Sequence, residues 1–224
     1  MIKCVVFDFD GTLVDSNGIK REVFFEIVRD QDPGGEIVAG VFERWPLADR
    51  YEKTRRIAEE LNDRTLLPAH SSVDEWASRL ANTYTAECES AITCCAEMPG
   101  ATETLDELSD KGLLLFINSA TPVEPLRRIL QLRNWTHFFR EVYGVEASKA
   151  ENLEEIALTT KTKPAEIIHI GDQYDDKHGA EEFGCHFVAM AACNSGPVNE
   201  QSTLIIKDLR ELPGLLSIID GETS

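Results

Sequence analysis

Two aspartates near the amino terminus stand where an α/β enzyme would place its reactive groups. Asp8 and Asp10 lie at the end of a predicted strand, residues 2–8, and Gly11 after them permits a tight reversal of the chain. Side chains alternate along a strand, so both carboxylates would leave it on one side. One could attack as a nucleophile while the other transfers protons, and together they could hold a divalent cation. The plainer interpretation is a strand that ends in a solvated acidic turn.

Three later segments also carry polar or charged groups near the ends of predicted strands. In a parallel α/β sheet such ends meet at one crevice. A hydroxyl, a lysine and a second acid cluster beside the first two aspartates are typical of a magnesium-assisted site for phosphoryl groups. The three segments are Asn118-Ser119-Ala120-Thr121 after a strand at 113–117, Lys149, and Gly171-Asp172 through Asp176 after a strand at 167–170.

Strands and helices alternate from residue 100 onward, which predicts a doubly wound, Rossmann-like α/β fold with a parallel sheet. The predicted strands are residues 2–8, 113–117, 141–143, 167–170, 186–190 and 204–206. The helices predicted between them are residues 101–111, 122–132, 149–160, 176–183 and 208–219, with a loop at 192–202.

Residues 16–96 differ from the rest because they show helical periodicity and almost no strand pattern. Asp15 or Ser16 would cap the first helix of this segment. Further helices are expected at about 36–44, 46–61 and 72–95. We therefore expect an α/β core domain formed by residues 1–15 and 97–224, and an inserted helical domain formed by residues 16–96.

Composition limits the classes of partner. The 224 residues are 42% hydrophobic, as in globular proteins, and carry a formal net charge of −18, which disfavours nucleic acid because phosphate backbones bind basic surfaces. No apolar stretch approaches the roughly 20 residues that span a bilayer, and the start lacks the features of a secretory signal. The six cysteines form no CxxC pair and suit a reducing compartment. We expect a cytoplasmic monomer or homodimer with no membrane partner.

The order and spacing of the motifs resemble those of the haloacid dehalogenase-like (HAD) superfamily across nearly the whole chain. The first motif of that family, DxDGT, matches Asp8 through Thr12, and the fourth, GDxxxD, matches Gly171 through Asp176. The second motif matches the apolar strand that ends at Ser119, and the third matches Lys149. The resemblance implies a C1-type helical cap inserted after the first motif, as in phosphoglycolate phosphatases and β-phosphoglucomutases.

The resemblance also implies a role for each matching residue. Asp8 would be the nucleophile, and Asp10 would protonate the leaving oxygen and then activate water. Thr12 would help to position Asp10, and Lys149 would offset charge between Asp8 and the phosphoryl group. The implied phosphate-binding residues are Asn118, Ser119 and Ala120. The implied Mg²⁺ ligands are Asp8, the backbone carbonyl of Asp10, and Asp172, with Asp176 supporting the metal or orienting the lysine.

Two of these assignments have competitors in the sequence. Lys149 lacks the proline that often follows this lysine in the family, and Lys161 and Lys163 are alternatives. Asp175 stands beside Asp176 and could replace it.

Arg50 and Lys53 are the candidate cap residues that would reach the substrate. Three residues apart on a helix, they can share a face. A solvated helix face is the plainer interpretation, and the alternative cations are Arg44, Arg55 and Arg56.

The expected activity is Mg²⁺-dependent hydrolysis of a small phosphomonoester, a sugar phosphate or phosphoglycolate-like acid, through an aspartyl-phosphate. Asp10 favours phosphate-ester chemistry, because family dehalogenases and phosphonatases lack an acid two residues after the nucleophile. A phosphomutase of β-phosphoglucomutase type shares every core residue and is the alternative. A catalytically silent binding module is the remote alternative.

Overall fold

The computed structural model describes residues 1–68, 70–191 and 204–222. The chain divides into two compact units. Met1–Ser16 and Thr93–Ser224 form the first, here called the core unit, and Asn17–Ile92 form the second, here called the helical unit. The loop predicted at 192–202 lies outside the described residues.

A parallel sheet organises the core unit. In the described part of the chain its strands follow the order β3-β2-β1-β4-β5-β6, and every neighbouring pair is parallel. This confirms the predicted Rossmann-like α/β fold. The strands are β1 (Cys4–Phe7), β2 (Leu114–Asn118), β3 (Phe139–Tyr143), β4 (Ile167–Gly171), β5 (His186–Met190) and β6 (Leu204–Ile206).

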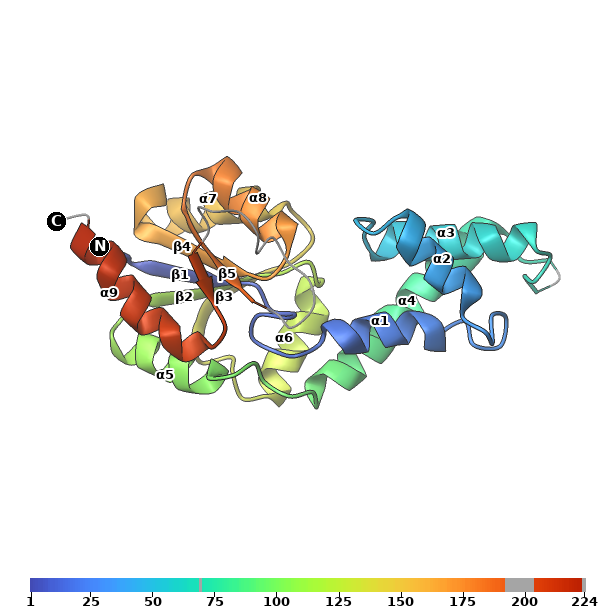
Figure 1. The fold of residues 1–224 in the computed structure, drawn as a ribbon, viewed down its shortest axis with the longest axis horizontal. Helices are drawn as coiled ribbons and strands as arrows, with labels where there is room; N and C mark the ends of the chain where they lie inside the picture. The colour runs from blue at the N-terminus through green and yellow to red at the C-terminus, as the bar shows by residue number, and fades with distance from the viewer. Residues whose placement is uncertain (69, 192–203, 223–224) are drawn as a thin grey trace. The chain divides into compact units, whose positions relative to one another are not determined.

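Helices cover both faces of this sheet. Figure 1 shows α7 and α8 over one face and α5, α6 and α9 over the other. The final predicted helix instead begins as a 3-10 turn at Leu209–Glu211 before α9. The helices are α5 (Ala101–Asp110), α6 (Val123–Leu132), α7 (Lys149–Thr160), α8 (Tyr174–Phe183) and α9 (Leu212–Glu222).

The central strand β1 is buried along its whole length. A strand covered on both faces by helices has no solvent side, which explains its continuous apolar sequence. Because β1 lies between β2 and β4, the strand order reverses on either side of it. Open α/β sheets bind ligands at the carboxyl ends of strands at such a reversal point, so Asp8 and Asp10 follow the strand that is best placed for chemistry.

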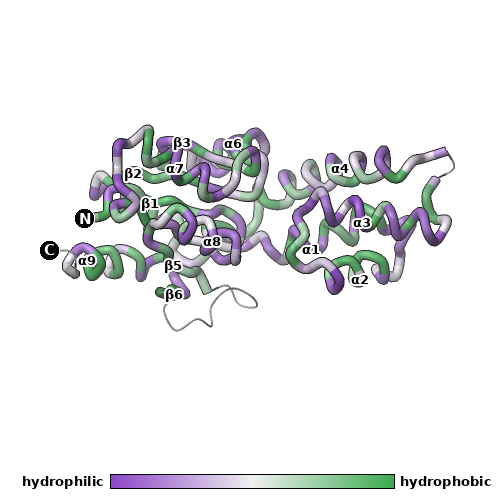
Figure 2. The backbone as a smooth tube through the Cα atoms, turned by 90° about the horizontal axis from the view of Figure 1, so that it is seen from above, coloured by the Kyte–Doolittle hydropathy of each residue, from purple (hydrophilic) through white to green (hydrophobic). Residues whose placement is uncertain are grey.

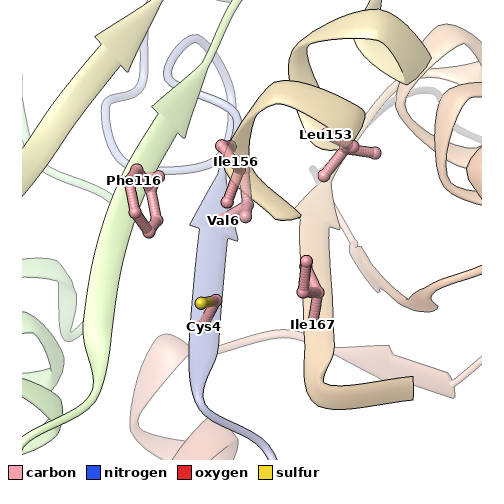
Figure 3. Close-up of a cluster of buried hydrophobic side chains, with 6 residues drawn as sticks. All are labelled: Cys4, Val6, Phe116, Leu153, Ile156 and Ile167. Carbon is pink, nitrogen blue, oxygen red and sulfur yellow. The ribbon is translucent and has the colours of Figure 1, made fainter. Parts of the chain in front are cut away.

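A compact cluster of apolar side chains fixes α7 against the sheet (Figure 3). The cluster combines two residues of β1 and one each of β2 and β4 with two residues of α7, and all of them are buried. Burying this surface favours docking of α7, and α7 is the helix that begins with Lys149. The members are Cys4, Val6, Phe116, Leu153, Ile156 and Ile167.

The helical unit contains α1 (Asn17–Glu26), α2 (Glu36–Arg44), α3 (Arg50–Asp63) and most of α4 (Val73–Thr93). Aromatic packing joins them, with the Phe24 ring centroid 5.2 Å from Phe42 and 4.2 Å from Tyr84. Hydrophilic colour dominates α3 in Figure 2 and is interrupted by apolar residues, as in an amphipathic helix. The start of α3 predicted near Pro46 was wrong, because the Asp49 carboxylate caps the helix by accepting a hydrogen bond from Glu52 N at 2.8 Å.

The boundaries of the two units differ from the predicted limits of the helical insertion, 16 and 96. Ser16 and residues 93–96 belong to the core unit. Two backbone hydrogen bonds explain this, because Asp15 N donates to Ala96 O at 3.0 Å and Met98 N donates to Leu13 O at 3.0 Å. No helix within the described residues has both the length and the apolar character needed to cross a membrane.

Candidate active site

The carboxyl end of β1 delivers both predicted catalytic aspartates. Asp8 is 5% exposed and Asp10 7% exposed, so both lie in an environment where charges interact strongly. Asp8 N donates a hydrogen bond to Ile170 O of the neighbouring strand at 2.8 Å. The chain then reverses at Gly11, whose φ of 82° is in the left-handed region that favours glycine.

Two hydroxyl groups hold the Asp10 carboxylate. Ser16 Oγ donates to Oδ1 at 2.6 Å, and Thr121 Oγ1 donates to Oδ2 at 2.8 Å. The sequence predicts that Thr12 positions Asp10 and that Asp15 or Ser16 caps a helix. Instead Thr12 is fully buried and its hydroxyl lacks a hydrogen-bond partner among the described residues, while Ser16 takes the expected role. Thr121 stands two residues after Ser119, which was the only sequence signal for it.

The ammonium of Lys149 joins two carboxylates. Its Nζ lies 2.8 Å from Asp8 Oδ1 and 2.7 Å from Asp176 Oδ1. The lysine is the first residue of α7, where Ser148 and Glu151 form a capping box. Of the two competing lysines, Lys161 is the residue that terminates α7 at its opposite end, and Lys163 caps a following 3-10 turn. The geometry therefore agrees with Lys149 as the lysine of the site.

Three buried carboxylates gather beside this lysine. Asp8, Asp172 and Asp176 each offer an oxygen, and these oxygens all lie within 4.8 Å of one another. Asp175 is exposed and takes no part in the group. The side chain of Asp10 is also outside the group. This agrees with the prediction that Asp10 would bind Mg²⁺ through its backbone carbonyl. Gln173 Nε2 donates to Asp172 Oδ2 at 2.5 Å and thereby orients that carboxylate.

The cluster carries more negative charge than its lysine balances. Burial and the nearby Asp176 raise the pKa of Asp8, although Lys149 opposes this rise. Burial likewise raises the pKa of Asp176, against the attraction of the lysine. Burial works to lower the pKa of Lys149, yet Asp176 and Asp8 raise it above its usual range. Hard oxygen donors with an excess of negative charge fit a divalent cation such as Mg²⁺.

Two glycines allow the site residues to pack this closely. A Cβ added at Gly171 would lie 2.3 Å from Asp176 Cγ, and one added at Gly179 would lie 2.4 Å from Lys149 Cβ. Any larger residue at either position would have to displace a group of the site. Gly171 belongs to the GDxxxD motif, whereas nothing in the sequence pattern of α8 indicates the role of Gly179.

The loop after β2 holds Ser119 in place. Ser119 is 2% exposed, its N donates to Tyr143 O at 3.0 Å, and its Oγ accepts from Thr121 N at 3.1 Å. Ala120 is exposed and, with Ser119 and Lys149, lines a depression of about 500 Å³ in the core unit. Asn118 is fully buried, and its side chain bonds to Lys149 O and Asn152 rather than lying open to a ligand.

The two predicted substrate-binding cations lie at the start of α3 in the helical unit. Arg50 places its guanidinium carbon 5.7 Å from the centre of the Tyr84 ring. Lys53 is 8% exposed, and its ammonium donates to the backbone carbonyls of Pro46 and Ala48. The bonds of Lys53 indicate a structural role within the unit, and the role of Arg50 stays a prediction.

Comparisons with known proteins agree with this geometry. A model of the haloacid dehalogenase-like hydrolase family matches residues 2–184. The chain is 26% identical over 196 residues to a glyceraldehyde 3-phosphate phosphatase from Methanopyrus kandleri, covering 82% of each chain. It is 25% identical over 232 residues to a phosphoglycolate phosphatase from Aliivibrio fischeri, covering 97% of this chain and 96% of the relative.

Two solved structures share the fold. A predicted phosphoglycolate phosphatase from Haemophilus somnus has a TM-score of 0.73 at 18% identity, covering 96% of this chain and 98% of the other. The HAD-hydrolase YfnB from Bacillus subtilis, bound to magnesium, has a TM-score of 0.72 at 16% identity with the same coverage. At these identities the likeness shows the fold alone.

Proposed function

We propose that this chain, which belongs to the haloacid dehalogenase-like hydrolase family, is a Mg²⁺-dependent phosphatase that hydrolyses a small phosphomonoester through an aspartyl-phosphate. The observation that carries the proposal is the buried arrangement of Asp8, Asp10 and Lys149. A nucleophilic carboxylate lies 2.8 Å from a fixed ammonium, and a second carboxylate two residues away is held by two hydroxyls. Phosphate-ester cleavage needs this combination of nucleophile, charge stabilisation and proton transfer.

The first chemical step assigns a bond change to each group. A carboxylate oxygen of Asp8 attacks phosphorus, and the bond from phosphorus to the ester oxygen breaks. Asp10 gives its proton to the departing oxygen, which leaves as an alcohol. Lys149 and the Ser119 hydroxyl stabilise the negative charge on the transferring phosphoryl oxygens.

The second step regenerates the enzyme. Asp10, now a carboxylate, takes a proton from a water molecule whose oxygen attacks phosphorus. The bond from phosphorus to the Asp8 oxygen breaks, inorganic phosphate leaves, and Asp8 is again a carboxylate. The Ser16 and Thr121 hydroxyls keep the Asp10 carboxyl in place through both steps.

The acidic cluster supports the choice of Mg²⁺. Asp8 and Asp172 would hold the ion, with the Asp10 carbonyl as a further ligand and Asp176 close by. When bound, the ion supplies positive charge that offsets repulsion between the carboxylates and the phosphoryl group.

The substrate is proposed as a small phosphorylated metabolite, a sugar phosphate or a phosphoglycolate-like acid. The relatives named above for phosphoglycolate and glyceraldehyde 3-phosphate support this class. The net charge of −18 favours a small substrate over a nucleic acid.

The test is phosphate release from a panel of small phosphomonoesters, with and without Mg²⁺, by the intact protein and by Asp8→Asn. We expect release that requires both the metal and Asp8. Release that persists at the wild-type rate in Asp8→Asn would contradict the aspartyl-phosphate mechanism. Interconversion of sugar phosphates without net release would identify a phosphomutase, and binding without either reaction would identify a silent binding module.

A further inference from the structure

A pair of buried amides is hydrogen-bonded to the main chain of Lys149. The pair consists of Asn118 at the end of β2 and Asn152 in the first turn of α7. Asn118 is fully buried and Asn152 is 5% exposed. Polar side chains so deeply buried cost stability unless they are fully hydrogen-bonded. The hydrogen-bond partners of the two amides therefore indicate what their side chains hold in place.

Asn118 is bonded to Lys149 in two ways. Its side-chain Nδ2 donates to Lys149 O at 3.0 Å, and its own backbone carbonyl accepts a hydrogen bond from Lys149 Nζ. The residue thus fixes both the main chain and the ammonium of the lysine. Because Asn118 immediately precedes Ser119, it also links the lysine to the residue whose hydroxyl the proposed function assigns to the same phosphoryl group.

Asn152 holds Asn118 in the required orientation. Its Nδ2 donates to Asn118 Oδ1 at 2.9 Å and to Gly144 O, just after β3, at 3.1 Å. An amide nitrogen has two donor hydrogens, so both are used. Because the Asn118 Oδ1 accepts a hydrogen bond from Asn152, the Asn118 amide must present its nitrogen to Lys149 O. Asn152 therefore joins the ends of β2 and β3 to the start of α7.

We propose that Asn152 is a positioning residue for Lys149, acting through Asn118 to fix the ammonium against Asp8 and the phosphoryl group. A lysine has four rotatable carbon–carbon links and loses much freedom when it is fixed. Its attraction to Asp8 and Asp176 draws the ammonium inward but does not set where the helix places its Cα. The apolar cluster docks α7 as a whole, and the amide pair ties its first turn to the ends of β2 and β3. The inference rests on the proposed function in one respect, the assignment of Lys149 to the phosphoryl group.

The test compares two Asn152 variants with a matched control on the same helix. Asn152→Asp keeps the volume of the side chain, Asn152→Leu keeps its number of heavy atoms but is larger, and both remove the amide donors. Ile156→Val, one turn later in α7, removes one methyl group from the apolar cluster and leaves every polar contact intact. The thermal unfolding midpoint of each variant identifies any general loss of stability.

Two readouts separate positioning from stability. The first is steady-state hydrolysis of the ester preferred by the wild type, where we expect kcat to fall about 10- to 100-fold in both Asn152 variants and to remain unchanged in Ile156→Val. The second needs no turnover. Acetylation of the metal-free protein by an N-hydroxysuccinimide ester, mapped by mass spectrometry, should modify Lys149 faster in the Asn152 variants, with exposed Lys161 as the internal reference.

The outcomes distinguish this inference from the proposed function. If the Asn152 variants match Ile156→Val in both kcat and Lys149 acetylation, the inference is overturned while the phosphatase assignment stands. If the wild type hydrolyses no ester but Lys149 loses protection in the variants, the positioning role is supported and the proposed function fails. Should Asn152→Leu not fold, Asn152→Asp alone decides by the same readouts.

Discussion

Ion pairs of similar length behave differently in the two units. In the core unit, Lys149 Nζ lies 2.8 Å from Asp8, and the two side chains are 9% and 7% exposed. In the helical unit, Arg55 lies 3.0 Å from Asp74, and the exposures are 55% and 78%. Water and salt screen the second pair, whereas the first is desolvated and bonded on several sides. We therefore expect the chemistry of this protein to depend on a few fixed charges, and exposed pairs such as Arg55 with Asp74 to change at little cost.

The largest test of this contrast removes the fixed charge. We expect Lys149→Met to lower kcat by about 10²- to 10³-fold, because the variant loses the cation that offsets charge on Asp8 and the phosphoryl oxygens. Steady-state phosphate release measures the effect. The matched control is Lys161→Met at the other end of α7, which should retain wild-type kcat. Equal losses of kcat in Lys149→Met and Lys161→Met would refute the special role of the buried lysine.

A second test moves the lysine without changing its charge. In Gly179→Ala the new methyl would lie 2.4 Å from Lys149 Cβ, so α7 and α8 must separate or the lysine must shift. We expect kcat to fall about 10- to 100-fold, as for other small displacements of catalytic groups. Gly214→Ala in α9, where a Cβ has nothing within 4 Å, is the control for adding a methyl to a helix. Unchanged kcat in Gly179→Ala would show that the packing tolerates the methyl.

A third test concerns the excess negative charge of the buried cluster. We expect Mg²⁺ to raise the thermal unfolding midpoint, because a ligand at 100 times its Kd stabilises a native protein by about 2.7 kcal/mol. Asp172→Asn should abolish most of the rise by removing one carboxylate of the cluster. Asp175→Asn, which changes the exposed neighbour, should keep it. A rise that survives in Asp172→Asn would place the ion elsewhere.

The fourth test distinguishes two kinds of cation within the helical unit. Lys53→Met removes the hydrogen bonds to the carbonyls of Pro46 and Ala48 and leaves these acceptors without their partner. We expect a loss of about 1–3 kcal/mol in unfolding free energy, measured by urea titration, with little change in KM. Arg50→Ala is measured in the same two assays, and its KM tests the predicted role of Arg50 in substrate binding. A large rise in KM for Lys53→Met at normal stability would restore the lysine to that role.

Residues marked by a local pattern could be predicted from the sequence, whereas contacts between distant residues could not. Asp8, Asp172 and Asp176 follow apolar strands at fixed offsets, and strand periodicity is a local property of the chain. The cluster that joins their side chains could then be inferred from topology. By contrast, Thr121 reaches Asp10 across 111 residues, and no local pattern marks a hydroxyl as the partner of a distant carboxylate.

Helix ends and amide contacts show the same limit. Residues 46–61 have helical periodicity, but the side chain of Asp49 decides that α3 begins at Arg50. The family resemblance implies a substrate-binding role for Asn118, but its side chain is bonded within the protein. Its partner Asn152 lies 34 residues away, and only their contact shows that the amide faces the lysine.

The smallest predicted effect comes from an exposed pair. Asp208 caps a 3-10 turn, and a hydrogen bond from the Arg210 side chain lowers the pKa of Asp208 from 3.8 to about 2. The folded-state pKa is below the unfolded value, so the pair contributes stability above the unfolded pKa and loses it as the pH falls toward 2. In Asp208→Asn we expect a slightly lower unfolding midpoint at neutral pH and a difference from wild type that shrinks below the ordinary pKa. A difference that stays constant down to pH 2, or does not shrink in high salt, would assign the effect to the capping hydrogen bond rather than to the charge.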